Sequence, residues 1–180
     1  METFRVRRAK EAEIPAVLEL WKELMDFHAA RDAHFTRAQD GHRSFGDYLR
    51  QQLAADAFLT LAEGEGKLIG YCLAMKAKYP PVFRDVDYGF ITDLLVTEAW
   101  RRRGVGPALL REALDWLAGQ GLRRIEVRVA VANEAGERFW RREGFRPYME
   151  VYCLEIPELD RGSPPSFSPP WQGGGPRREP

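Results

Sequence analysis

Residues 96–110 read VTEAWRRRGVGPALL and place three consecutive arginines beside Gly104 and Gly106, before the chain turns apolar. The preceding stretch, residues 88–96, predicts a long strand, and the apolar spacing after Gly106 predicts a helix. The first amides of a helix have no partner within it, and its N-terminus carries partial positive charge. The glycines leave the backbone uncovered and the arginines add positive charge, so the stretch predicts an anion site suited to a diphosphate. The alternative is a capped helix with solvated arginines.

Three phosphate-binding motifs compete for this stretch. The Walker A motif needs Gly-Lys-Ser/Thr after its second glycine, and the chain reads Gly-Pro-Ala, so it is excluded. The Rossmann fingerprint needs a third glycine at Leu109, although Glu126 stands at about the spacing of its ribose-binding acid, so a nucleotide-binding protein stays open. The third pattern, Arg/Gln-x-x-Gly-x-Gly/Ala, is matched at each defined position by RRRGVG, residues 101–106.

The remaining chain predicts strands and helices on both sides of the motif. Apolar residues at helical spacing predict amphipathic helices, and alternating apolar residues predict strands. Glycines mark a hairpin at EGEG and the ends of two helices. The expected order is a strand at 4–6, helices at 14–25 and 44–53, strands at 57–62 and 67–75, the long strand, a helix from Gly106 to Gly119, a strand at 123–131, a short helix capped by Asn133, and a strand at 148–156.

Composition limits the classes of function. The 180 residues are 44% hydrophobic, and Lys+Arg and Asp+Glu both number 27, so no global charge favours nucleic acid or a membrane surface as a partner. No apolar run reaches the length of a membrane span, and the N-terminus lacks the apolar core of a secretory signal, so we expect a cytoplasmic protein. Cys72 and Cys153 lie in strand-like runs without CxxC or Cys/His clustering, which predicts buried free thiols and no metal site.

The composition changes near Pro157. Residues 157–180 are rich in Pro, Gly and Ser, with too little apolar content to pack, and we expect a disordered tail after a single domain of residues 1–156.

Element order and motifs together resemble the GNAT family of N-acetyltransferases over roughly residues 3–156. The resemblance rests on ITDLLV, RRRGVG and the downstream run NEAGERFWRREGF, residues 133–145. It implies an α/β (α+β) fold with a mixed, strongly twisted central sheet that splays open after the long strand and is flanked by helices. It also implies acetyl-CoA as cosubstrate, held in the V-shaped gap, with no metal.

The resemblance also implies roles for particular residues. The backbone at Leu94, Leu95 and Val96 would pair with the pantetheine arm, and the turn amides would hold the pyrophosphate. Asn133 matches the asparagine that usually contacts the cofactor arm, and Arg138 lies on the same helix, facing the expected phosphate side. The turn comprises Arg101, Arg102, Arg103, Gly104, Val105, Gly106 and Pro107.

One departure from the family pattern concerns the acid that protonates the departing thiolate. The position often held by tyrosine is Trp140, whose indole cannot act as that acid. A thiol of pKa about 8.5 leaves as thiolate at pH 7 at a cost of roughly 2 kcal/mol, so the loss need not abolish activity. Tyr148 or water could supply the proton, the indole NH of Trp140 could donate a hydrogen bond to sulfur, and core packing of Trp140 is the other interpretation.

A strongly basic amine acceptor would need a base. A lysine-like amine is mostly protonated at pH 7, at a cost of about 4 to 5 kcal/mol, whereas an α-amino group costs little more than 1 kcal/mol. Asp93 on the long strand is the candidate base, acting directly or through water if burial raises its pKa; a structural strand aspartate is the alternative. Polyamine-acetylating relatives have an acidic pair here, whereas position 92 is threonine, which weakens a polyamine substrate.

The stretch expected to roof the acceptor site contains all three histidines. His28, His34 and His42 are expected in an exposed loop, as solvated side chains or as proton relays. Four acids lie in or next to the same region and could make the acceptor pocket receptive to a cationic amine. These are Asp26, Asp32, Asp40 and Asp47.

The sequence thus predicts an acetyl-CoA-dependent N-acetyltransferase in which a primary amine attacks the thioester directly in a ternary complex. The acceptor is a small molecule or a peptide or protein amine, and the sequence does not choose between them. Two alternatives are a non-catalytic acyl-CoA-binding module, in which Trp140 marks a lost acid, and a partner-binding protein acting through the tail. The family resemblance is compatible with a homodimer, which no residue requires.

Overall fold

A computed structural model describes residues 3–154, so the predicted tail and the end of the expected last strand lie outside the described residues. The chain divides into two units, Met1–Phe145 and Arg146–Pro180. The first unit contains every described helix and strand.

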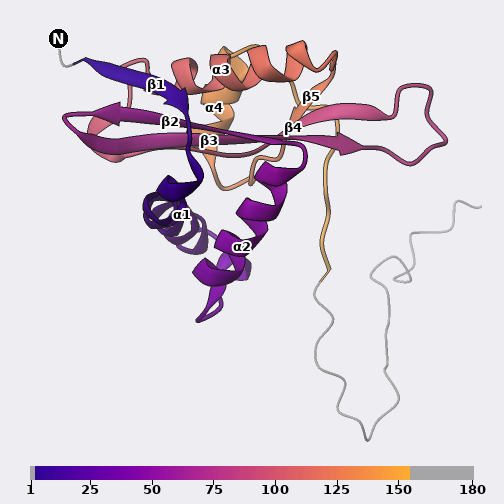
Figure 1. The fold of residues 1–180 in the computed structure, drawn as a ribbon. Coiled ribbons are helices and arrows are strands. Elements are labelled where there is room, and N and C mark those ends of the chain that lie inside the picture. Colours follow the sequence, from indigo (N-terminus) through magenta and orange to yellow (C-terminus); the bar gives the residue numbers. More distant parts are fainter. Residues whose placement is uncertain (1–2, 155–180) are drawn as a thin grey trace, which may run out of the picture. The chain divides into compact units, whose positions relative to one another are not determined.

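The first unit is built on one mixed sheet of five strands in the order β1-β2-β3-β4-β5 (Figure 1). Neighbouring strands are antiparallel except β4 and β5, which are parallel. This confirms the predicted mixed sheet. The strands are β1 (Phe4–Arg8), β2 (Ala57–Gly64), β3 (Lys67–Lys78), β4 (Asp87–Val96) and β5 (Ile125–Val127).

Helices cover both faces of the sheet, α1 and α2 on one and α3 and α4 on the other (Figure 1). Each face has its own apolar core, one formed by α1, α2 and the inner strands around Leu59 and Leu73, the other by α3 and α4 around Ile91 and Leu109. The helices are α1 (Ile14–Ala29), α2 (Gly41–Ala54), α3 (Val105–Gly119) and α4 (Glu134–Arg142), with short 3-10 turns η1 (Glu11–Glu13), η2 (Ala33–Phe35) and η3 (Glu98–Trp100).

A β-bulge at Thr92 interrupts β4. Leu73 of β3 pairs with Asp93 and the next residue, Ala74, pairs with Ile91, so Thr92 is the extra residue. Its hydroxyl donates a hydrogen bond of 3.1 Å to the carbonyl oxygen of Leu73. An uninterrupted strand would keep residues 91 and 95 on one face, yet Ile91 packs in the α3 core and Leu95 in the α1 core. The bulge therefore reverses which side chains of β4 face each helix layer.

The pairing of β5 with β4 stops at this bulge. The last pair is Ile91 with Val127, although alternation predicts a strand over 123–131. Beyond it the two backbones have no ladder, because the bulge bends β4 away from its parallel neighbour. Val131 is accordingly 98% exposed. The predicted strand is thus mostly wrong, and the predicted splaying of the sheet is confirmed.

No strand forms over residues 148–154 of the second unit, where alternation predicts one. The pattern describes the period of the side chains, but a strand also needs a partner backbone. Val151 and the next residue, Tyr152, are 83% and 85% exposed, so the segment has no buried face. Cys153 is exposed as well, contrary to expectation, whereas Cys72 is buried.

The histidine-rich stretch is more helical than predicted. The buried stripe of α1, which includes Val17, Trp21 and Leu24, continues at helical spacing to His28, and the helix ends only at Ala29. The other two histidines lie in η2 and α2. The expected exposed loop is therefore confirmed for residues 30–40, and it is wrong for the two ends of the stretch, which belong to α1 and α2. None of the described helices is long and apolar enough to cross a membrane.

Near its first residues, β3 packs closely on β4 at Gly70, which predicts that a larger residue at this position lowers the stability of the fold. A Cβ at residue 70 would lie 2.6 Å from the carbonyl oxygen of Leu95, which is backbone and cannot rotate away. We expect Gly70→Ala to lower the free energy of unfolding by about 1–3 kcal/mol in urea denaturation.

The control is Gly119→Ala at the end of α3, where no atom lies within 4 Å of an added Cβ. This variant should be unchanged or more stable by up to about 1 kcal/mol. Equal stability of the two variants would contradict the packing argument.

Candidate active site

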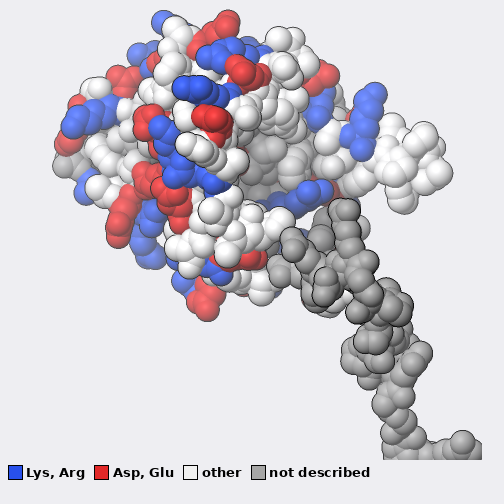
Figure 2. Space-filling view, turned by 90° about the horizontal axis from the view of Figure 1, so that it is seen from below, with Lys and Arg blue, Asp and Glu red and all other residues white. Residues whose placement is uncertain are grey.

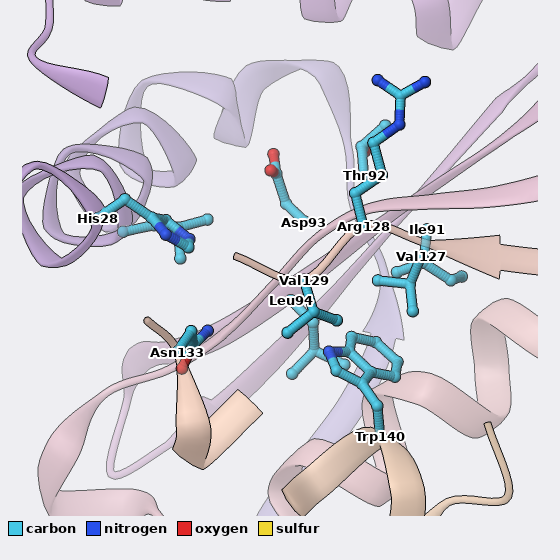
Figure 3. A pocket seen from close by; sticks show the side chains of 11 residues that line it. His28, Ile91, Thr92, Asp93, Leu94, Val127, Arg128, Val129, Asn133 and Trp140 are labelled. Atoms are coloured by element: carbon cyan, nitrogen blue, oxygen red, sulfur yellow. The ribbon is translucent and has the colours of Figure 1, made fainter. Parts of the chain in front are cut away.

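A pocket of about 70 Å³ opens where β4 and β5 part, which is room for a few water molecules or a small chemical group (Figure 3). It is lined by Leu24 and His28 of α1, by 91–94 of β4, by 127–129 at and after the end of β5, and by Asn133 and Trp140. Of the predicted site residues, the structure thus brings together Asp93, Leu94, Asn133 and Trp140.

Asp93 is a buried carboxylate in this pocket. Burial raises the pKa of Asp93 from 3.8 to about 6, and the nearby hydroxyl of Tyr71 offsets part of that rise. Burial, followed by the charge of Asp93, raises the pKa of Tyr71 well above its ordinary value. The two groups fall short of hydrogen-bond geometry, so the Tyr71 hydroxyl is a buried donor without a partner among residues 3–154. The carboxylate is therefore a stronger base than an ordinary aspartate.

Beyond Asp93, the edge of β4 that faces β5 has no strand partner in the described chain. Residues 94–96 pair with β3 on one side only. Leu95 is buried in the α1 core and Val96 packs against the α3 core, so the free edge offers backbone amides and carbonyls rather than side chains. Such an edge can accept an extended ligand as an additional strand.

The arginine and glycine turn follows directly at the end of β4. The Nε of Arg101 donates a hydrogen bond of 3.1 Å to the carbonyl oxygen of Val96, which anchors the turn to the strand. Arg102 has φ 62°, a conformation that few residues other than glycine adopt, and Gly104 has φ 85° and caps α3. The guanidinium of Arg103 lies 5.2 Å from the centre of the Trp100 ring. The turn lies outside the lining of the pocket.

The two glycines of the turn serve different purposes. No atom lies within 4 Å of a Cβ added at Gly104, so this backbone is open, as an anion site requires. At Gly106 an added Cβ would lie 3.2 Å from the ring of Phe139 in α4, so the missing side chain makes room for helix packing instead. Val105 is buried, and Pro107 has no amide hydrogen, which leaves the backbone amides of residues 105 and 106 as donors in the first turn of α3.

Asn133 begins α4, as predicted. Its Oδ1 accepts a hydrogen bond of 2.9 Å from the amide of Gly136. A Cβ at residue 136 would lie 2.5 Å from Nδ2 of Asn133, which explains glycine where the family pattern has alanine. With Oδ1 engaged by the cap, Nδ2 remains as the donor that Asn133 can present to the pocket.

Trp140 belongs both to the α3 core and to the pocket. Its ring contacts Phe139 and Phe145 edge-on, at centroid distances of 5.0 and 5.1 Å, and it is 9% exposed. Figure 3 shows its indole nitrogen on the side of the ring that faces the pocket. Core packing and a role in the pocket are therefore compatible.

Arg138 and Tyr148 are two further residues that the sequence predicted for the site. Arg138 is exposed and pairs with Glu134, one turn earlier on α4, at 3.2 Å. Tyr148 is 54% exposed and belongs to the second unit, outside the one that contains the pocket. Neither residue lines the pocket.

His28 is the residue that sequence reasoning underrated. Its ring projects from α1 toward the space between Asp93 and Asn133 (Figure 3). Its Nδ1 is buried and has no hydrogen-bond partner in the described part of the chain. Burial, and secondarily the charge of Arg31, lowers the pKa of His28, so the ring is neutral at pH 7. The four-residue spacing from Leu24 on the buried stripe was the signal that could have identified it.

The four acids expected to make the pocket negative do not line it. Asp26 pairs with Arg37 at 2.7 Å, and Asp47 pairs with Arg50 at 2.9 Å. Asp32 accepts a hydrogen bond from the amide of His34, and Asp40 lies 4.0 Å from Arg43. The predicted acidic acceptor pocket is therefore wrong. Within residues 3–154, no group of three or more His, Cys, Asp or Glu side chains could hold a metal ion.

Solved structures share this fold. An aminoglycoside N-acetyltransferase, AAC(6')-Iy, in complex with CoA has a TM-score of 0.71 at 18% identity, covering 87% of this chain and 97% of that one. A predicted acetyltransferase from Clostridium acetobutylicum with acetyl-CoA has a TM-score of 0.72 at 17% identity, covering 85% and 96%. The aminoglycoside 6'-N-acetyltransferase AAC(6')-IG from Acinetobacter haemolyticus has a TM-score of 0.67 at 23% identity, covering 84% and 97%.

Sequence comparison leads to a family. An uncharacterized N-acetyltransferase from Methanocaldococcus jannaschii is 25% identical over 147 residues, which are 81% of this chain and 62% of the relative. The chain thus spans less than two thirds of the length of that relative. The family model described as Acetyltransferase (GNAT) family matches residues 17–145, which include most of α1, the whole sheet after β1, the turn and α4. The chain therefore belongs to the GNAT acetyltransferase family.

Proposed function

We propose that the protein transfers the acetyl group of acetyl-CoA to an amine by direct attack in a ternary complex. The observation that carries the proposal is the opening of the sheet at the Thr92 bulge. From that point on, β4 has an unpaired backbone edge and carries a buried carboxylate with a raised pKa. The chain that leaves β4 then forms the open arginine and glycine turn.

The residues fit acetyl-CoA in two places. The free backbone edge at Leu94, Leu95 and Val96 would hydrogen-bond the pantetheine arm, and the amide of Leu94 or Leu95 would polarise the thioester carbonyl. The backbone of residues 102–107 and the charges of Arg101 to Arg103 would hold the diphosphate. Nδ2 of Asn133 would donate to the pantetheine arm, and Arg138 would add charge near the phosphates.

Asp93 is the proposed base, with His28 beside the same pocket as a second proton acceptor. A carboxylate of pKa about 6 takes a proton from an α-ammonium group of pKa about 8 at a cost of roughly 3 kcal/mol, which is well within reach of an enzyme. The new N–C bond forms as the C–S bond breaks. Two protons leave the nitrogen and pass through the base to solvent, and the departing thiolate takes up one proton, so that one proton is released overall.

The titratable groups of the described pocket lining are Asp93 and His28, both proposed as proton acceptors, and Arg128. The indole NH of Trp140 can donate a hydrogen bond to sulfur without giving up its proton. We propose that water supplies the proton, with Tyr148 as the alternative acid. Residues 1–156 remain the proposed catalytic domain.

The first test is thiol release from acetyl-CoA by the purified chain against amino acids, polyamines, aminoglycosides, arylamines and short peptides. We expect turnover with at least one class, rising with pH between about 5 and 7 as Asp93 ionises. Tight binding of acetyl-CoA without turnover of any amine would favour the non-catalytic acyl-CoA-binding module, for which Trp140 in the pocket is the supporting observation.

Asp93→Asn should make the protein more stable and less active. Because the pKa of Asp93 is raised in the folded protein, its ionised form costs stability once the pH exceeds 6, and wild type regains stability as the pH falls from 6 to 4. The amide cannot ionise, so at pH 8 the free energy of unfolding of the variant, measured by urea denaturation, should exceed that of wild type by up to about 3 kcal/mol. This difference should disappear below pH 4. Acetyl transfer should fall by about 10²-fold or more.

Asp87→Asn is the matched control, since Asp87 is an exposed aspartate of the same strand that pairs with Lys78 at 3.8 Å. This variant should change stability by no more than about 0.5 kcal/mol and leave activity intact. Destabilisation of Asp93→Asn at pH 8 would indicate a structural ion pair or hydrogen bond instead of a base.

His28→Asn should slow the acetylation of basic amines selectively. Methylamine must lose a proton before it attacks, whereas trifluoroethylamine is already neutral at pH 7 and needs no base. We expect kcat/KM to fall by about 10²-fold for methylamine and only slightly for trifluoroethylamine. His34→Asn, on η2 and outside the pocket lining, is the control and should behave as wild type. Equal losses with both amines would assign His28 a purely structural role.

A further inference from the structure

Arg128 is a cation at the edge of the pocket without a carboxylate partner. It follows the last residue of β5 and lines the pocket. Its guanidinium lies 5.4 Å from the centre of the Phe90 ring on β4, which favours one orientation of the side chain. No carboxylate among residues 3–154 forms an ion pair with it. The nearest acid along the strand, Glu126, is hydrogen-bonded by Arg124 at 2.7 Å and also by Tyr79.

The position of Arg128 places it on the acceptor side. Val127 packs against the α3 core, so the next side chain, Arg128, faces the opposite side of the strand. Figure 3 shows the side chains of Arg128 and Asp93 extending in the same direction, with Trp140 on the other side of the pocket. The base and the unpaired guanidinium therefore face the same end of the pocket.

The pocket offers few carboxylates to an acceptor with several positive charges. Asp93 is the only carboxylate of the pocket lining, and Asp26, Asp32 and Asp47 are each engaged by a nearby arginine or backbone amide. Seen from the side of α1 and α2, the hollow beside the protruding β3–β4 hairpin has Lys and Arg side chains at its margin (Figure 2). Aminoglycosides and polyamines carry several ammonium groups, whereas the described pocket lining offers them a single carboxylate, Asp93.

We infer that the acceptor is an amine that carries a carboxylate a few bonds from its nitrogen, as a small amino acid does, with Arg128 binding the carboxylate while Asp93 receives the proton of the ammonium group. This inference rests on the proposed acetyltransferase function and names its substrate class. The planar guanidinium matches a carboxylate with two parallel hydrogen bonds, which an ammonium group cannot reproduce. Because both residues line one pocket of about 70 Å³, the two groups of the acceptor are close together.

The test compares acids with their own amides, using glycine, β-alanine and γ-aminobutyrate against glycinamide, β-alaninamide and γ-aminobutyramide, with spermidine and kanamycin as polycations. We expect at least one acid to exceed its amide and both polycations in kcat/KM. Arg128→Gln should lower kcat/KM for that acid by about 10- to 100-fold and change the amide by less than about twofold. Arg128→Lys should lose less kcat/KM for that acid than Arg128→Gln but remain below wild type, because lysine keeps the charge and lacks the planar pair of hydrogen-bond donors.

Arg141→Gln is the matched control, since Arg141 is an exposed arginine of α4 that pairs with Glu137 and does not line the pocket. It should leave all rates unchanged. Preference of the wild type for amides or polycations, or an equal loss for acid and amide in Arg128→Gln, would overturn the inference.

A binding measurement separates this inference from the proposed function. If no amine is acetylated, isothermal titration of the three acids onto the CoA-saturated protein still tests Arg128. Binding of one acid that Arg128→Gln abolishes and Arg141→Gln retains would support the inference while the proposed function fails. Absence of binding by all three acids would overturn the inference, whether or not some other amine is acetylated.

Discussion

The bulge at Thr92 is the constraint on which the site depends. A single extra residue in β4 ends the ladder with β5 and leaves the backbone of residues 94–96 without a strand partner on one edge. It also moves Asp93 to the side of the sheet where Leu24 and His28 of α1 line the pocket, and burial there raises its pKa. Without the extra residue, β4 and β5 would continue to pair, the pocket would close and the carboxylate would change sides. Backbone geometry thus creates the space and the basicity together.

The chemistry of the pocket follows from unequal burial on its two sides. On the α1 side, Asp93, Tyr71 and His28 are polar groups withdrawn from water, two of them with an atom that lacks a hydrogen-bond partner in the described structure. Unpaired buried groups cost stability, and proteins tend to keep them where a ligand supplies the partner. On the α4 side the lining is the indole of Trp140 and the cap residue Asn133, both held by their own helix. The groups that can exchange protons therefore lie on the proposed acceptor side, and the residues on the other side shape the pocket.

Much of this architecture could be predicted from the sequence, because local signals determine it. The turn at 101–106, the helix caps and the long strand follow from glycines, capping residues and hydrophobic period, and the order of elements identified the family. Strand pairing was less predictable: alternation at 123–131 and 148–156 gives the side-chain period but not the partner. Asp93 was found because it lies within the strand motif ITDLLV, whereas His28 was underrated because a polar residue at the end of a buried stripe looks like the start of a loop. The ion pair between Asp26 and Arg37 depends on how the chain folds back after α1, which composition does not reveal.

The contact between Gly106 and Phe139 has a mechanical consequence. The ring of Phe139 in α4 packs on the bare backbone at Gly106, so α4 lies close to the first turn of α3 at this point. The proposed diphosphate site is at the start of one helix, and Asn133 and Trp140 are on the other. A larger side chain at residue 106 would push the Phe139 ring, and α4 with it, away from the start of α3, and so change the distance between the two ends of the proposed cosubstrate path. In the proposed site, the length of cosubstrate arm that fits would then depend on a packing contact that touches no ligand.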